Sequence, residues 1–192
     1  MTTQFLKISG LDLDFDGSRF EGKHFEVIDD FLSIEENNKI IDSLQSREDP
    51  KPWYFVDRLN NGHKMGNYYF CIVPYQPRFN LYVEKYDPIY QPILDKLGIF
   101  KEQVDKVKFN LYPYVGNQSF QHPPHVDYTS VEGLRTCLYY VNQCKRTTNF
   151  DTVKQVEAKQ NRAIIFDGSI PHQSSTPVDI HAAYSINIDY KY

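Results

Sequence analysis

The sequence predicts a mainly β domain with supporting helices, and two observations lead to this prediction. Aromatic residues, chiefly fifteen Tyr and thirteen Phe, make up 15% of the 192 residues, and aromatic side chains favour strands. The second half of the chain is a series of short β-branched or aromatic segments without helical segments between them, which is typical of antiparallel sandwiches and barrels. A chain of this length is expected to fold as one domain. Residues 1–105 would supply helical support and lid segments, and residues 106–192 the core strands with the functional site.

The first predicted elements are a strand and a helix that follow one another closely. HFEVIDDF, at residues 24–31, has the composition of a strand. SIEENNKIIDSLQS, at residues 33–46, places its aliphatic residues on one helical face. Ser33 and Glu36 match the capping box that begins many helices, so the helix is expected to start there.

The segment between this helix and residue 106 is expected to contain short strands and a second helix. Residues 50–86 are rich in Tyr, Phe and Pro, and PWYFVD and NYYFCIV have the composition of strands joined by loops. We expect this segment to help line or cover a binding site. Residues 87–99, DPIYQPILDKLGI, predict a helix that begins at an Asp-Pro pair and ends at Gly98.

The remaining elements are all predicted to be strands. They are short, β-branched or aromatic, and most are bounded by turn residues. The predicted strands are KVKFNLYPY at 106–114, LRTCLYYVN at 134–142, NRAIIFDG at 161–168 and AAYSINIDY at 182–190.

Composition narrows the classes of function. The net charge of −4 provides no general attraction for nucleic acid or an anionic membrane, and it disfavours a nucleic-acid substrate. The three cysteines, Cys71, Cys137 and Cys144, are an odd number without a CxxC pair and fit reduced intracellular thiols. The start of the chain lacks a signal-peptide pattern, and no apolar run is long enough to span a membrane. We therefore expect a cytoplasmic protein.

An acidic segment near the start resembles half of a calcium loop. Asp12, Asp14, Asp16 and Gly17 match its first positions, but Lys23 stands where the loop requires a bidentate Glu. No amphipathic helix flanks the segment. A short strand that ends in an Asp-Gly turn is the better interpretation.

The stretch QHPPHVDYTS contains a candidate metal site. In a strand, residues two apart project to the same face, so His125 and Asp127 can reach one ion, whereas a Pro-Pro pair separates His122 from them. His172 follows in FDGSIPHQSS, after a predicted strand and a Gly/Pro turn. Two His and one carboxylate form the facial triad of non-haem Fe(II) oxygenases. The alternative is that the three are unrelated surface or capping residues.

In their order along the chain, these motifs resemble the 2-oxoglutarate/Fe(II)-dependent dioxygenase superfamily, in particular its prolyl-hydroxylase-like branch and the small members common in bacteriophage genomes. FEVIDDFLSIEENNKIIDSL is similar to the family's entry strand and first supporting helix. HVD resembles its His-x-Asp motif, and FDGSIPHQSS the segment with the distal His. RTCLYYVN is similar to the strand that follows the His-x-Asp loop in prolyl hydroxylases. The resemblance covers most of the chain.

The resemblance implies a double-stranded β-helix, which is a cupin-like jelly roll, with the N-terminal helices packed on one side. It implies that His125, Asp127 and His172 bind Fe(II), that 2-oxoglutarate chelates the metal, and that O₂ is used to hydroxylate a C–H bond. The substrate would be a protein, a peptide or a small molecule. His122 would be a loop residue near the site entrance and not a ligand. A phage-encoded member would act in the host cytoplasm.

The last predicted strand departs from the family pattern. The family binds the distal carboxylate of 2-oxoglutarate with a basic residue, usually Arg, on this strand, where the present sequence has His181 and Ala183. Neither reproduces the paired hydrogen bonds of a guanidinium. Three alternatives stay open. Protonated His181 binds the carboxylate, another basic residue such as Arg135 or Lys108 reaches it, or the protein uses another co-substrate or none.

Tyrosines are further candidates for the co-substrate site. The resemblance implies that Tyr112 and Tyr140 point inward and donate hydrogen bonds to 2-oxoglutarate, with Tyr114 as a substitute for Tyr112. The face of LRTCLYYVN that carries Tyr140 matches the family's inward face, and Arg135 lies on the opposite face.

Three functions are therefore compared. The leading one is an Fe(II)/2-oxoglutarate-dependent hydroxylase. The missing basic residue motivates the second, a non-catalytic binding or structural protein on the same scaffold. The third is a cupin-like metalloenzyme that does not use 2-oxoglutarate.

Overall fold

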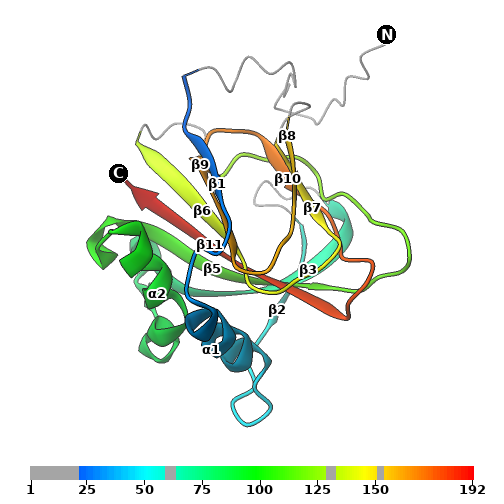
Figure 1. Cartoon of the computed structure of the whole chain (residues 1–192), viewed down its shortest axis with the longest axis horizontal. Helices are drawn as coiled ribbons and strands as arrows, with labels where there is room; N and C mark the ends of the chain where they lie inside the picture. The colour runs from blue at the N-terminus through cyan, green and yellow to red at the C-terminus, as the bar shows by residue number, and fades with distance from the viewer. Residues whose placement is uncertain (1–21, 59–63, 129–132, 151–153) are drawn as a thin grey trace.

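The computed structural model describes residues 22–58, 64–128, 133–150 and 154–192. The acidic segment with Asp12, Asp14, Asp16 and Gly17 lies outside these residues. Within them, eight strands form a large antiparallel sheet in the order β1-β9-β6-β11-β5-β3-β2, with β4 paired to β3 (Figure 1). Its strands are β1 (Phe25–Ile28), β2 (Tyr54–Arg58), β3 (Lys64–Gln76), β4 (Leu81–Tyr82), β5 (Val104–Pro113), β6 (Leu134–Tyr140), β9 (Arg162–Asp167) and β11 (Ala182–Lys191).

A second, smaller antiparallel sheet faces the large one. In the described part of the chain it has the strand order β10-β7-β8. Its strands are β7 (Thr147–Phe150), β8 (Lys154–Glu157) and β10 (His172–Ser174). Side chains from both sheets form one apolar cluster, which includes Phe150 of the small sheet and Phe166 of the large sheet. The two sheets therefore form the predicted jelly roll, with part of the core between them.

The two α-helices of the described residues lie on the other face of the large sheet (Figure 1). They are α1 (Ile34–Gln45) and α2 (Asp87–Leu97), and short 3-10 turns occur at η2 (Pro77–Phe79), η3 (Glu84–Tyr86) and η4 (Lys101–Gln103). The predicted capping box is present, since Glu36 N donates to Ser33 Oγ and Ser33 N donates to Glu36 Oε2. Gly98 caps α2 in the left-handed conformation that favours glycine.

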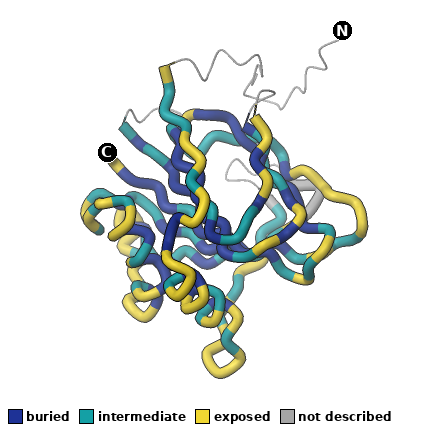
Figure 2. Tube along the Cα trace, in the orientation of Figure 1, coloured by how far each residue is buried: buried dark blue, intermediate teal, exposed yellow. Residues whose placement is uncertain are grey.

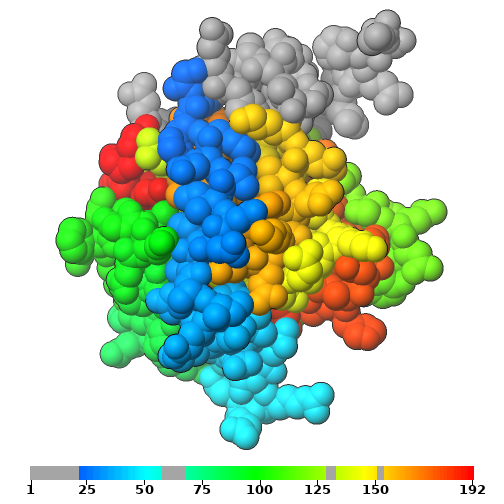
Figure 3. Space-filling model, in the orientation of Figure 1, coloured from blue at the N-terminus to red at the C-terminus, as the bar shows by residue number. Residues whose placement is uncertain are grey.

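Alternation along the strands divides the core into two parts. On β6, Cys137 and Tyr139 belong to the apolar cluster that faces the helices, whereas Leu138 and Tyr140 belong to the cluster between the sheets. Figure 2 shows the buried residues concentrated on the strands and the exposed ones on the outer sides of the helices and on loops. The band formed by β1 and α1 crosses one face of the molecule, between α2 and the segment around β8 (Figure 3).

A buried asparagine attaches the N-terminal helix to the sheet. Asn161 is 4% exposed and has a left-handed backbone, with φ of 61°. Its side-chain oxygen accepts from Leu32 N at 2.9 Å, and its Nδ2 donates to Leu32 O at 2.7 Å. Tyr139 also donates its hydroxyl hydrogen to Asn161 Oδ1, at 2.9 Å. These bonds fix the chain just before α1.

The predicted strands of the large sheet and the two predicted helices that pack on it are present, but their first and last residues differ from the prediction. The predicted strand at 24–31 is shorter, because the backbone of Asp30 is left-handed, with φ of 51°. NYYFCIV belongs to the longer β3. The prediction did not include β7, β8 and β10. They are short and largely polar, and they are held by pairing with one another more than by a long apolar pattern.

Candidate metal centre and adjoining cavity

The chain joins the HVD segment to β10 through the backbone. The amide of His125 donates to the carbonyl of His172 at 2.9 Å, and the reverse bond has the same length. Asp127 N donates to Gly168 O at 3.0 Å. This approach is close, because a Cβ atom added at Gly168 would lie 3.0 Å from the Tyr128 ring. The three predicted ligand residues therefore lie at one place between the sheets.

The side chains of this triad converge. Their ligand atoms all lie within 4.8 Å of one another. The Nε2 atoms of His125 and His172 lie 3.9 and 3.7 Å from the Asp127 carboxylate. Metal–ligand bonds of about 2.1 Å can bridge such separations with small side-chain rotations.

Backbone carbonyls select the tautomer of both imidazoles. His172 Nδ1 lies 3.1 Å from Ile170 O, and His125 Nδ1 lies 3.4 Å from Pro123 O. A carbonyl oxygen only accepts, so each Nδ1 carries the hydrogen and each Nε2 keeps its lone pair for a metal. Phe166 and Phe150 pack against the His172 ring, with centroid distances of 5.0 and 5.7 Å, and restrict its rotation.

Protonation favours the same role. Burial, reinforced by the nearby His172, lowers the pKa of His125 well below its usual value. Burial raises the pKa of Asp127, but the two imidazoles and the neighbouring lysines lower it by more, so that it lies below its usual value. At neutral pH His125 is therefore neutral and Asp127 is a carboxylate, which are the forms that bind a metal ion.

A second carboxylate supports Asp127 through a shared hydroxyl. Thr136 Oγ1 lies 2.8 Å from Asp127 Oδ2 and 2.9 Å from Asp189 Oδ1. Asp189 is 1% exposed, and Lys106 Nζ lies 2.7 Å from its Oδ2. Tyr128 OH donates to Asp105 Oδ2 at 2.6 Å and also lies 3.3 Å from Asp189 Oδ2. This network fixes the plane of the Asp127 carboxylate and leaves its Oδ1 for a metal.

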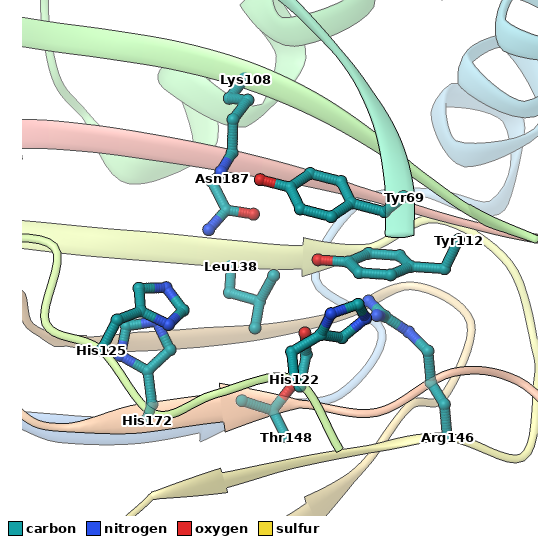
Figure 4. A pocket seen from close by; sticks show the side chains of 11 residues that line it. Tyr69, Lys108, Tyr112, His122, His125, Leu138, Arg146, Thr148, His172 and Asn187 are labelled. Atoms are coloured by element: carbon teal, nitrogen blue, oxygen red, sulfur yellow. The ribbon is translucent and has the colours of Figure 1, made fainter. Parts of the chain in front are cut away.

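A cavity opens next to the triad, and Figure 4 shows the side chains that line it. Most of the residues that line it have a polar or charged side chain. It comprises Tyr69, Lys108, Tyr112, His122, His125, Leu138, Arg146, Thr148, His172, Ser174 and Asn187.

Arg146, which directly precedes β7, is the principal feature of the cavity that the sequence did not reveal. The residue is 3% exposed, and neither Nη1 nor Nη2 has a hydrogen-bond partner among the described residues. The guanidinium stacks 4.0 Å from the Tyr112 ring centroid and 5.3 Å from that of Tyr140. Two unpaired, buried guanidinium donors carry a free-energy cost, which a bound anion would remove.

His122 is a loop residue, as expected, and it lies in the wall of the same cavity. It is 4% exposed, and neither ring nitrogen has a hydrogen-bond partner among the described residues. Its ring meets Tyr69 and Tyr112 edge-on, at 5.8 and 5.6 Å. Burial, with the charges of Arg146 and Lys108, lowers the pKa of His122 to about 4. It is therefore a neutral imidazole at neutral pH.

The candidate tyrosines occupy different depths. Tyr112 lines the cavity (Figure 4). Tyr140 lies behind it, and its hydroxyl donates at 2.7 Å to Thr148 Oγ1, which lines the cavity. Tyr114 is 40% exposed and bonds to Asn117, so Tyr112 is the tyrosine of NLYPY that faces the site.

The candidate basic residues also separate. His181 is exposed, and Arg135 lies near Asp167, at 3.9 Å, and stacks on the Tyr192 ring. Neither lines the cavity, whereas Lys108 does. Among the described residues, the cations at the cavity are thus Lys108 and Arg146.

Comparisons with known proteins agree with this architecture. No protein-family model matches the sequence, and a search of curated protein sequences gives no significant match. A prolyl hydroxylase from Trichoplax adhaerens, solved with a hypoxia inducible factor peptide fragment, is similar over 92% of this chain and 86% of its own, with a TM-score of 0.62 and 15% identity. A Pseudomonas putida prolyl-4-hydroxylase is similar over 92% of this chain and 96% of its own, with a TM-score of 0.54 and 14% identity.

A third solved structure extends the likeness beyond prolyl hydroxylases. The alpha ketoglutarate dependent epimerase SnoN from nogalamycin biosynthesis is similar over 91% of this chain and 81% of its own, with a TM-score of 0.61 and 10% identity. The chain therefore has the double-stranded β-helix fold of the prolyl hydroxylases and 2-oxoglutarate/Fe(II) oxygenases. No helix in the described part of the chain is long and apolar enough to cross a membrane.

Proposed function

We propose that the protein is an Fe(II)- and 2-oxoglutarate-dependent dioxygenase that hydroxylates a C–H bond of a protein, a peptide or a small molecule. One observation carries the proposal. A cluster of two imidazoles and one carboxylate opens onto a cavity that also contains a buried arginine with two unpaired donors. Such an arrangement suits a dicarboxylate that binds a metal at one end and a guanidinium at the other.

The residues of the triad fit a ferrous ion. His125 and His172 would bind it through Nε2, and Asp127 through Oδ1, because their other polar atoms already have hydrogen-bond partners. A facial set of two His and one carboxylate leaves positions for a co-substrate and O₂. When bound, the metal and its co-substrate activate O₂, so that one oxygen atom enters the substrate and 2-oxoglutarate becomes succinate and CO₂.

Arg146 would bind the distal carboxylate of 2-oxoglutarate. Its two unpaired Nη atoms match the two oxygens of a carboxylate, and stacking on Tyr112 holds the guanidinium plane in place. Tyr112 and neutral His122 would donate further hydrogen bonds. The sequence left three candidates for binding the distal carboxylate, namely His181, Arg135 and Lys108, and we assign this role to Arg146 instead. The absence of a basic residue from the last strand was the reason to consider a non-catalytic protein, and Arg146 would supply the missing cation.

Apolar side chains lie beside the triad. Leu138 forms one wall of the cavity, and the rings of Phe150 and Phe166 lie against His172. An apolar wall beside the metal protects reactive species from side reactions and strengthens the hydrogen bonds within the site.

Anaerobic titration tests the proposal. Addition of 2-oxoglutarate to the Fe(II)-loaded protein is expected to give the weak visible charge-transfer band of the chelate, and exposure to O₂ is expected to give succinate. His172→Ala should remove both signals. If wild-type protein gives neither the band nor succinate, the co-substrate assignment is wrong. Bound metal together with turnover that needs no keto acid would favour the cupin-like alternative, and a biological phenotype unchanged in His125→Ala would favour the binding protein.

A further inference from the structure

The positively charged groups at the site differ in whether a negatively charged group lies beside them. Lys106 pairs with Asp189 at 2.7 Å. Under the proposed function, Arg146 pairs with the distal carboxylate of 2-oxoglutarate, and the ferrous ion is balanced by Asp127 and the proximal carboxylate. Lys108 remains. No carboxylate of a described residue lies within 4.0 Å of its Nζ, although it lines the cavity.

Lys108 stands beside two further hydrogen-bond donors. It is in register with Asn187 on the neighbouring strand β11. Asn187 Oδ1 accepts from Asn110 Nδ2 at 2.9 Å, which turns Asn187 Nδ2 to face the cavity without a partner among the described residues. The Lys108 ammonium lies 5.6 Å from the Tyr69 ring centroid, and the Tyr69 hydroxyl points towards Lys108 and Asn187 (Figure 4).

This group lies at the metal end of the cavity and not at the Arg146 end. Lys108 and Asn187 are each two residues from Lys106 and Asp189, the pair that supports Asp127. On a strand, this spacing keeps the side chains on the same face and about 7 Å apart. A group bound by Lys108 would therefore lie close to the reacting centre, where the primary substrate binds.

We propose that Lys108, Asn187 and Tyr69 form a subsite for a carboxylate of the primary substrate, so that the enzyme acts on a small organic acid close to its carboxylate. This inference rests on the proposed function. One ammonium with two neutral donors matches a single negative charge, whereas a phosphate dianion would leave charge uncompensated. Burial of Lys108 opposes its charge, yet the nearby phenol groups and Asp127 raise the pKa of Lys108 above its usual value, so it stays positive.

A matched pair of uncharged and charged probes tests the subsite. Acetate and acetamide have nearly the same shape and differ in charge. Each is added at constant ionic strength to the anaerobic Fe(II)·2-oxoglutarate protein, and the visible band of the chelate is followed. In wild type, acetate is expected to shift the band in a saturable manner, and acetamide is expected to leave it unchanged. Lys108→Met should weaken the acetate response at least tenfold, and Lys108→Arg should keep it.

Each other outcome overturns the inference. In one such outcome, wild type and Lys108→Met respond equally to acetate, or neither responds. In another, acetamide shifts the band as much as acetate does. Loss of the band on adding acetate would mean that acetate displaces 2-oxoglutarate. A more than tenfold weaker binding of 2-oxoglutarate to Lys108→Met would assign Lys108 to the co-substrate. Absence of the band from wild type before any probe is added would instead contradict the proposed function, and the inference would fall with it.

Discussion

Replacement of Arg146 by Met is expected to separate binding of 2-oxoglutarate from stability of the fold. Met has a similar length and can fill the space between Tyr112 and Tyr140, but it offers no charge and no donor. Truncating one partner of a buried, hydrogen-bonded charge pair costs roughly 2–5 kcal/mol. If the loss of binding free energy is about 3 kcal/mol, and each 1.4 kcal/mol changes the dissociation constant tenfold, 2-oxoglutarate should bind about 150-fold more weakly.

The unbound protein should not lose stability. The wild-type guanidinium has two buried Nη atoms without partners, and each of them costs about 1–3 kcal/mol. Its stacking on Tyr112 at 4.0 Å and on Tyr140 at 5.3 Å returns about 1–2 kcal/mol in all. The cost is at least as large as the return, so the free energy of unfolding of Arg146→Met without ligand should equal or exceed that of wild type.

Two measurements give these quantities. The dissociation constant of 2-oxoglutarate comes from anaerobic titration of the visible band, and the free energy of unfolding comes from urea denaturation without metal. Lys145→Met is the matched control, because Lys145 is the exposed neighbour of Arg146 and its removal should change affinity less than twofold. The reasoning is refuted if Arg146→Met binds 2-oxoglutarate within threefold of wild type. It is also refuted if the variant loses several kcal/mol of stability while its affinity is unaffected.

Three further predictions concern the metal support, the buried histidine and the core. Thr136→Val should weaken Mn(II) binding tenfold or more, because the Asp127 carboxylate loses its orienting hydroxyl. Thr136→Ser keeps the hydroxyl and should bind Mn(II) like wild type. Calorimetry that finds equal Mn(II) affinities for Thr136→Val and wild type would contradict this. Metal-free protein should lose stability as the pH falls from 6.5 to 4, because in that range the unfolded chain takes up a proton on His122 and the folded chain does not. In urea unfolding at pH 7 and pH 4, His122→Phe should remove about 3 kcal/mol of this loss. If the pH dependence of the variant equals that of wild type, His122 is not the group responsible. Asn161→Ala should cost about 3 kcal/mol of unfolding free energy through its lost bonds to Leu32, and a loss below about 1 kcal/mol would show that these bonds contribute little.

Much of the fold follows from local patterns in the sequence. The capping box at Ser33 and the glycine at 98 define the start of one helix and the end of the other. The alternation in LRTCLYYVN, together with the family resemblance that identified its inward face, predicted which side chains of β6 point between the sheets, and Leu138 and Tyr140 do so. For the helix ends a few adjacent residues carry the whole signal, so no knowledge of distant pairing was needed.

The co-substrate end of the cavity depends instead on pairing between distant segments. Arg146 precedes a four-residue strand of polar composition, and only the pairing of β7 with β10 brings that strand next to His172. At the start of the last strand, where the family pattern has its basic residue, this sequence offers His181, which is exposed. The one local clue was an alternating polar run, TTNF, directly after an arginine. The position of His122 was likewise hidden, because a loop residue is buried or exposed according to what packs against it.

A crystal structure with Mn(II) and 2-oxoglutarate bound is the sharpest single test of the proposed site. The metal is expected within about 2.3 Å of the Nε2 atoms of His125 and His172 and of an Asp127 oxygen. The distal carboxylate is expected to accept hydrogen bonds from both Nη atoms of Arg146. A metal bound elsewhere, or a distal carboxylate that does not contact Arg146, would contradict this assignment.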